Sequence, residues 1–176
     1  MPTVKQISQA FDELRKESND RAAAIVGATL VEMGLDEAIL SRLLPLSNNI
    51  RDALFRDDQG YTFSSKIDLG FALGLYGQKA RTDLHRIKRI RNEFAHNLDR
   101  SFESAEIIKI CRDLTDYRSG EPLREDILEQ TGTLRSYVEG REIRWRYVFA
   151  ILRMGQALER ETRIRHQPPL PTELTE

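Results

Sequence analysis

The stretch RIKRIRNEFAHNLDR, residues 86–100, has the spacing of an amphipathic helix. Its apolar side chains recur every three or four residues, so on a helical wheel of about 100° per residue they fall on one stripe. The members of this stripe, with the preceding leucine, are Leu84, Ile87, Ile90, Phe94, Ala95 and Leu98. An apolar stripe of this kind must face a core, so the segment predicts a helix over residues 79–97 that packs against other helices.

Polar residues on the same helix fall into two groups. Arg91 lies inside the apolar stripe, where an unpaired guanidinium is strongly destabilising. A separate polar flank carries His85, Arg89, Asn92 and His96. Arg91 and His96 are about 140° apart on the wheel, so one regular helix does not bring them to the same face.

A carboxylate that matches Arg91 lies in an earlier segment. Residues 21–44 predict a long helix that stops before a proline, because the residue before proline is pushed out of the α region. Glu32 falls inside the apolar stripe of this helix. We therefore expect a buried, bidentate ion pair between Glu32 and Arg91 that fixes how the two helices dock. Asp20 and Asp68 are alternative partners for Arg91.

The other periodic segments also predict helices, and no stretch has the alternation of a strand. Further helices are expected in the first 17 residues and over 49–55, 65–76, 103–114 and 143–165. The expected fold class is all-α, a helical bundle. We expect a helical core domain at 1–115, a linker with room for one short helix at 116–142, a C-terminal helix at 143–166 that packs on the core or on a dimer partner, and a flexible tail at 167–176.

Composition indicates an ordinary globular protein with enough apolar residues for a core. The chain has 176 residues, of which 40% are hydrophobic and 31% charged, and its formal net charge is −1. This balance does not favour nucleic acid or membrane as a partner of the chain as a whole. No run approaches the roughly 18 apolar residues of a membrane span, and the first residues lack the apolar segment of a signal peptide. We expect a cytoplasmic protein without membrane contact.

The sequence does not favour a metal site or a reactive cysteine. Cys111 is the only cysteine, which excludes an internal disulfide and a cysteine-built metal site, and its apolar neighbours favour a buried, inert thiol. The three histidines, His85, His96 and His166, do not combine with acidic residues at ligand spacing. We expect no metal and no cofactor.

Three segments together resemble successive blocks of the mannitol operon repressor family. In chain order they are NDRAAAIVGATLVE at 19–32, FSSKIDLGFALGLY at 63–76 and DLHRIKRIRNEFAH at 83–96. The resemblance covers about residues 18–100 and implies an all-α bacterial regulatory protein of a family labelled as transcriptional regulators. No helix-turn-helix, zinc finger or RNA-recognition aromatic signature accompanies it, so such a regulator is expected to act through a protein partner or on RNA.

RNEFAH is also similar to the Arg-x4-His motif of the HEPN superfamily, the helical domains of prokaryotes and higher eukaryotes. That resemblance implies a metal-independent endoribonuclease that works across a dimer interface. It would place Arg91 on the phosphorane-like transition state, His96 as general acid or base, and Asn92 on the phosphate. The alternative is structural: Arg91 locks the helix to the fold, Asn92 forms helix-end hydrogen bonds, and His96 is favoured by the helix dipole. The sequence leaves both hypotheses open.

Basic residues surround the motif. They are Lys79, Arg81, Arg86, Lys88, Arg89 and Arg100, opposed nearby by Asp83, Glu93 and Asp99. Such a patch is typical either of a surface that attracts an RNA or DNA backbone, with His85, Lys88 and Arg89 as the candidate contacts, or of a solvated helix face. The last helix is apolar over a wide arc, which favours a homodimer.

Overall fold

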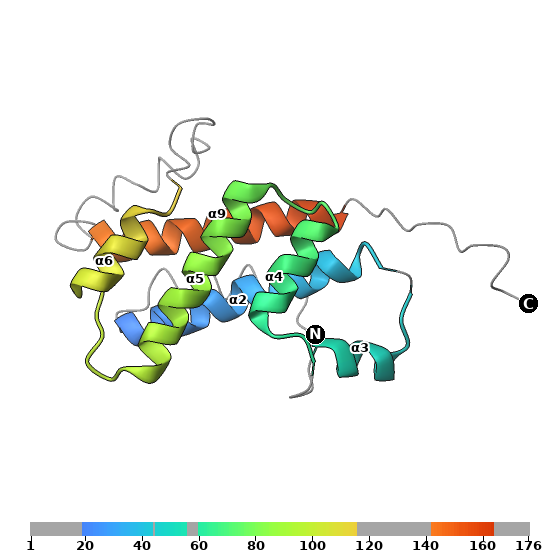
Figure 1. Ribbon diagram of the computed structural model, residues 1–176, viewed down its shortest axis with the longest axis horizontal. Helices are drawn as coiled ribbons and strands as arrows, with labels where there is room; N and C mark the ends of the chain where they lie inside the picture. Colours follow the sequence, from blue (N-terminus) through green and yellow to red (C-terminus); the bar gives the residue numbers. More distant parts are fainter. Residues whose placement is uncertain (1–18, 44, 56–59, 116–141, 164–176) are drawn as a thin grey trace, which may run out of the picture.

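The computed structural model describes residues 19–43, 45–55, 60–115 and 142–163. Within these residues the chain forms six helices and no strand (Figure 1). They are α2 (Asp20–Leu40), α3 (Asn48–Phe55), α4 (Phe63–Ala72), α5 (Gln78–His96), α6 (Ala105–Arg112) and α9 (Glu142–Arg163). The prediction of an all-α helical bundle is confirmed.

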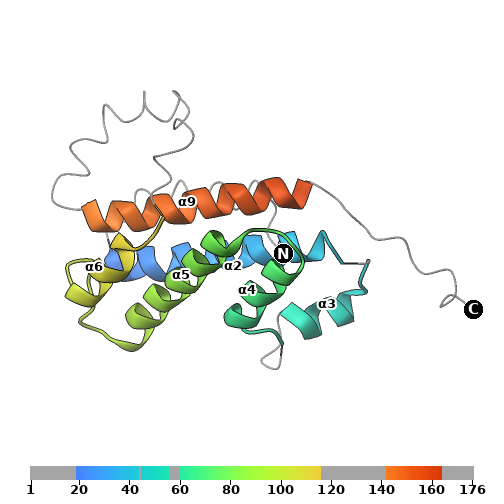
Figure 2. The same ribbon diagram turned by 45° about the horizontal axis from the view of Figure 1, so that its top comes forward.

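Helices α2 and α9 run side by side in the same direction along the length of the molecule, and α4 and α5 cross them (Figures 1 and 2). Near the start of both helices, the Tyr147 hydroxyl donates to the Ala24 carbonyl at 2.8 Å. Farther along, Gly34 leaves room for Leu158, whose side chain lies 3.7 Å from where a Cβ on that glycine would be. The C-terminal helix therefore closes the core against α2.

The core contains a row of aromatic rings contributed by distant parts of the chain. Phe94 of α5 lies with its ring centroid 5.0 Å from that of Phe102, and Phe102 lies 5.4 Å from Tyr147 of α9. All three side chains are buried. Tilted rings at these separations attract each other in addition to the apolar area that they bury, so the row ties α5, the segment before α6 and α9 together.

The turn after α4 differs from the prediction. The helix ends at Ala72 rather than Tyr76, and Gly74 adopts a left-handed conformation with φ of 71°. The Leu75 amide donates to the Gly70 carbonyl and the Gly74 amide to the Phe71 carbonyl, which is the Schellman arrangement of a helix end. Gly77, which directly follows the predicted end of this helix at residue 76, precedes α5 as its N-cap residue.

Two members of the apolar stripe predicted on α5 are exposed. Leu84, Ile87, Ile90 and Phe94 are buried in the core, as expected. Ala95 is exposed, and the side chain of Leu98 is 88% exposed. Helix α5 ends at His96, so Leu98 lies beyond the last turn, where the periodicity of the helix no longer sets its direction.

Some predictions concern residues that the structure does not describe. The helix expected in the first 17 residues, the linker at 116–142 apart from Glu142, and the tail at 167–176 lie outside the described ranges. None of the helices described is long and apolar enough to span a bilayer.

Candidate functional site

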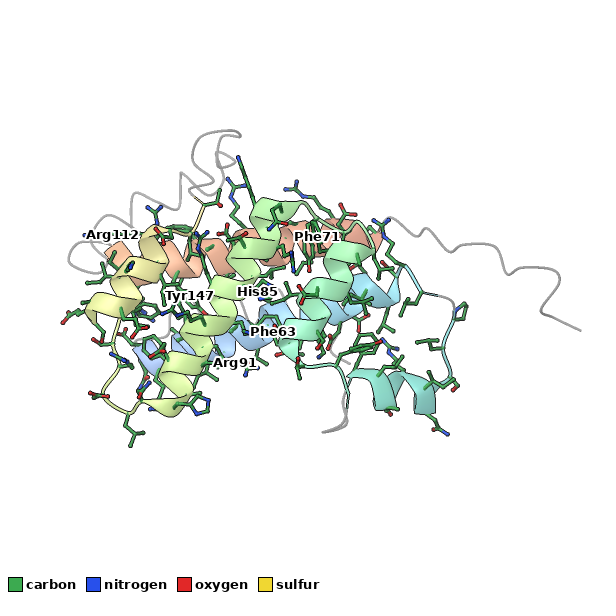
Figure 3. The ribbon with its side chains drawn as sticks, in the orientation of Figure 1. Phe63, Phe71, His85, Arg91, Arg112 and Tyr147 are labelled. Atoms are coloured by element: carbon green, nitrogen blue, oxygen red, sulfur yellow. The ribbon has the colours of Figure 1, made fainter. Side chains whose placement is uncertain are left out.

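The structure brings Glu32 and Arg91 together. Arg91 Nη2 donates to Glu32 Oε2 at 3.1 Å, and the Arg91 guanidinium lies 5.8 Å from the centre of the Phe63 ring on α4 (Figure 3). The contact uses one nitrogen and is not the bidentate pair expected, because the other oxygen of Glu32 accepts from Lys66. Arg91 is also 32% exposed, so it lies at the margin of the core and not within it.

Lys66 is the buried cation of this region. Its Nζ lies 3.1 Å from Glu32 Oε1 and 3.0 Å from Asp36 Oδ2, and it donates to the Phe55 carbonyl at 3.5 Å. The Lys66 side chain is only 5% exposed. We call Glu32, Asp36, Lys66 and Arg91 the charge cluster. Its two carboxylates and two cations sum to no net charge. Charged groups can be buried away from water only when they are paired in this way.

Asp36 is a buried carboxyl group of the charge cluster whose pKa departs from its ordinary value. Burial raises its pKa from 3.8 to about 6, although Lys66 acts in the opposite direction. A carboxyl group with a raised pKa binds its proton more tightly in the folded chain than in the unfolded chain. Its contribution to stability is therefore fully present below about pH 4 and is lost as the pH rises through about 6.

Of the three residues that the HEPN resemblance would make catalytic, Arg91 and Asn92 contact each other and His96 lies at the end of the same helix. Arg91 faces Glu32 and Phe63, and the Asn92 amide oxygen accepts from Arg91 Nη1 at 3.4 Å. His96 is the last residue of α5 and is exposed. Helix α5 is α-helical through His96, so within one chain it does not loosen there as a shared Arg91–His96 site would require.

The alternative partners considered for Arg91 are engaged elsewhere. Asp20 accepts from the Phe102 amide at 3.1 Å and lies 3.6 Å from Arg144. Asp68 lies 2.7 Å from Arg81 and 3.4 Å from His85, and hydrogen bonding to Arg81 lowers the pKa of Asp68.

Carboxylates oppose most of the basic side chains around the motif. The pairs are Arg81–Asp68, Arg86–Asp83, Arg89–Glu106, Arg100–Glu93 and Arg100–Glu106. Lys88 instead lies 3.2 Å from the Ser64 hydroxyl. Asp68 and Glu106 come from α4 and α6, so counting charges along α5 alone overstated the positive character of this surface. A mixture of both signs suits a polyanionic backbone less well than a stripe of cations does.

Two residues of the charge cluster, Lys66 and Asp36, were not predicted as site residues, yet the sequence carries a signal for both. Lys66 shares the face of α4 formed by Phe63, Ile67 and Gly70, since these positions are spaced three and four apart. Asp36 follows Glu32 by one helical turn, which places two carboxylates on the same side of α2. Lys66 within the apolar face of α4, together with Glu32 and Asp36 on one side of α2, indicates a buried ionic contact between the two helices.

The remaining chemistry-bearing residues are accounted for by packing. Cys111 is buried, and burial raises the pKa of its thiol to about 12, so it is a poor nucleophile. Among the described residues no three His, Cys, Asp or Glu side chains are grouped as metal ligands would be. His166 lies outside the described part of the chain.

Replacing Arg91 with alanine is expected to lower the free energy of unfolding by about 1–2 kcal/mol. The loss is moderate because Arg91 is one-third exposed and Lys66 still neutralises Glu32. Urea unfolding at neutral pH measures it, with His96→Ala as the matched control, expected to change stability by less than about 0.5 kcal/mol. An Arg91 variant as stable as the wild type would show that the contact does not fix the helices.

Comparison with known proteins supports the fold. No protein-family model and no curated protein matches the sequence. Among solved structures, the chain is similar to MtlR, the mannitol repressor, in the X-ray structure of the MtlR–HPr complex from Escherichia coli. The TM-score is 0.61 with 15% sequence identity, and the match covers 86% of this chain and 97% of that chain. Likeness at this identity is a likeness of fold, and it lends no support to the HEPN motif. The chain thus has a mannitol-repressor-like fold.

Proposed function

We propose that this chain is a regulatory protein that acts by binding a protein partner, as a member of the mannitol-repressor-like group. The observation that carries the proposal is the fold, which matches MtlR over 97% of that chain. In the matched structure MtlR is part of a complex with another protein, HPr. HPr is therefore the first partner to test.

The arrangement of side chains favours protein binding over RNA cleavage. In an endoribonuclease of the Arg-x4-His type, Arg91 must be free to reach a phosphate and His96 must share its site. In this chain Arg91 contacts Glu32, and its guanidinium lies 5.8 Å from the centre of the Phe63 ring. The surface around it mixes cations and carboxylates, as protein interfaces do, and this weakens the attraction for a nucleic-acid backbone.

Isothermal titration calorimetry of the full chain with purified HPr tests the proposal. We expect saturable binding with one HPr for each chain. The matched control is the same titration with the Phe94→Ala variant, whose destabilised fold should bind less HPr. Titrations that show no saturable heat with wild type would remove HPr as the partner.

Other features predicted from the sequence belong to the same proposal and need their own measurements. They are the homodimer, the contacts of His85, Lys88 and Arg89 with RNA or DNA, and the cytoplasmic location. Analytical ultracentrifugation of the full chain tests the homodimer. A gel-shift assay with RNA and DNA at two salt concentrations tests the nucleic-acid contacts. Under the proposal, any nucleic-acid binding is expected to weaken steeply with salt and to be independent of sequence.

A further inference from the structure

Helix α3 is held to the bundle by few buried groups. Of its residues, only Phe55 is buried, and the side chain of Ile50 is 51% exposed. Its contacts include an ion pair between Arg51 and Glu37 at 3.2 Å and the hydrogen bond from Lys66 to the Phe55 carbonyl. Figure 2 shows α3 at the edge of the bundle, beside α4. A short helix with one buried side chain is the element expected to open most easily.

The carboxylate of Asp36 lies near the end of α3, and only one of its two oxygens has a hydrogen-bond partner among the described residues. Asp36 Oδ2 accepts from Lys66 Nζ, while Asp36 Oδ1 is buried and has no hydrogen-bond partner among the described residues. The Asp36 side chain is 10% exposed. An ionised carboxylate with a buried, unpartnered oxygen is costly, and either a proton or access to water relieves that cost.

The same ammonium joins this carboxylate to α3. Lys66 Nζ contacts both Asp36 Oδ2 and the carbonyl of Phe55, the last residue of α3. The Phe55 ring centre also lies 6.0 Å from Lys66 Nζ. Movement of α3 away from Lys66 therefore uncovers the group to which Asp36 is bonded.

The other charged groups near Asp36 come from all the elements around it. They are Glu32 and Glu37 of α2, Lys66 of α4, Arg91 of α5 through Glu32, and Arg51 of α3 through Glu37. Lys66 favours the ionised form of Asp36, whereas Glu32 and Glu37 favour the protonated form. Each outer cation is paired with a carboxylate of its own, so Lys66 is the cation that acts directly on Asp36.

We propose that Asp36 is a proton-binding site that controls the docking of α3. With the proton bound, α3 stays packed over Lys66. Loss of the proton shifts the equilibrium toward an open state, in which α3 has moved away and water solvates the carboxylate.

The sign of the effect follows from proton linkage. In the closed state burial raises the pKa of Asp36 to about 6, and on opening the pKa falls back toward its ordinary 3.8. The closed state therefore binds the proton more tightly, so a rise in pH favours the open state. With these two pKa values the opening equilibrium constant increases roughly tenfold between pH 5 and pH 7.5.

Hydrogen–deuterium exchange of the full chain at pH 5 and pH 7.5 tests the proposal. After correction for the intrinsic exchange rates, the protection of residues 48–55 in the wild type is expected to fall roughly tenfold at the higher pH. In Asp36→Asn, which carries no charge at either pH, the protection of α3 should be high and independent of pH. Asp99→Asn removes an exposed carboxylate instead and should keep the wild-type response.

Two results would overturn the proposal. One is equal protection of α3 in the wild type at the two pH values, and the other is a pH response that persists in Asp36→Asn. Where Asp36→Asn fails to fold, carbon-13 NMR of the wild type provides an independent measurement. It should show the Asp36 carboxyl titrating near pH 6 together with a shift of the α3 amide signals, and titration at the ordinary value would also overturn the proposal.

Discussion

Replacing Lys66 with methionine is expected to lower the free energy of unfolding by about 3–5 kcal/mol at pH 7.5. The methionine keeps most of the volume of the lysine, so the loss reports the missing charge and not a cavity. Without the ammonium, Glu32 and Asp36 remain as two carboxylates close together at a largely buried position, and the Phe55 carbonyl loses its donor. Urea unfolding followed by circular dichroism measures the difference.

The same variant should be less destabilised at pH 5. Lys66 is among the groups that lower the pKa of Asp36, so its removal raises that pKa further and Asp36 is protonated in the folded variant at the lower pH. Lys79→Met is the matched control, because Lys79 is exposed on the neighbouring helix. This control should change stability by less than about 0.5 kcal/mol. If both variants behave alike, Lys66 is not the group that holds α2 and α4 together.

Replacing Phe94 with alanine is expected to lower the free energy of unfolding by about 3–5 kcal/mol. Phe94 is fully buried, and its ring packs against Phe102 in the aromatic row that joins α5 to α9. Truncation removes both the buried area and the ring contact and leaves a cavity.

Leu98→Ala provides the control for this prediction. Leu98 lies four residues after Phe94 and on the same stripe of the wheel, but its side chain is 88% exposed. Its truncation should alter stability by less than about 0.5 kcal/mol, and thermal or urea unfolding of the two variants side by side makes the comparison. Similar losses for Phe94→Ala and Leu98→Ala would mean that α5 continues beyond His96 and buries Leu98.

The sequence predicts the helices well because each carries a clear periodicity, and it predicts their ends less well. The apolar stripe of α5 identifies Leu84, Ile87, Ile90 and Phe94 correctly as core residues. It fails at Leu98, because periodicity has no meaning past the end of a helix, and Asn97 already has an extended backbone. The predicted end of α4 is wrong for a related reason: Gly74 and Gly77 both follow the helix, and the chain forms its helix-end turn at Gly74.

Candidate site residues were harder to predict, because a charge acquires its partners from other helices. The wheel located Glu32 and Arg91, and the structure places them 3.1 Å apart. It could not show that Lys66 would take the other oxygen of Glu32. Nor could the charges along α5 show that Asp68 of α4 and Glu106 of α6 face Arg81 and Arg89, since such pairs depend on how the helices dock.

The residues of RNEFAH lie in two different surroundings. Arg91 belongs to the charge cluster that joins α2, α4 and α5, whereas His96 ends the helix in solvent. Substitutions at these two positions should therefore affect different properties of the protein. We expect substitution of Arg91 to lower stability and substitution of His96 to leave the fold of a single chain unchanged.

One experiment tests most directly whether RNEFAH is structural or catalytic. Structured RNA is incubated in EDTA with the purified wild type, Arg91→Ala or His96→Ala. The melting temperature of each protein is measured in parallel. We predict that the RNA stays intact with all three proteins, that Arg91→Ala melts at a lower temperature, and that His96→Ala melts like the wild type. Cleavage by the wild type that survives EDTA and is lost in a normally melting His96→Ala would contradict the structural role of Arg91 and make RNEFAH a catalytic motif.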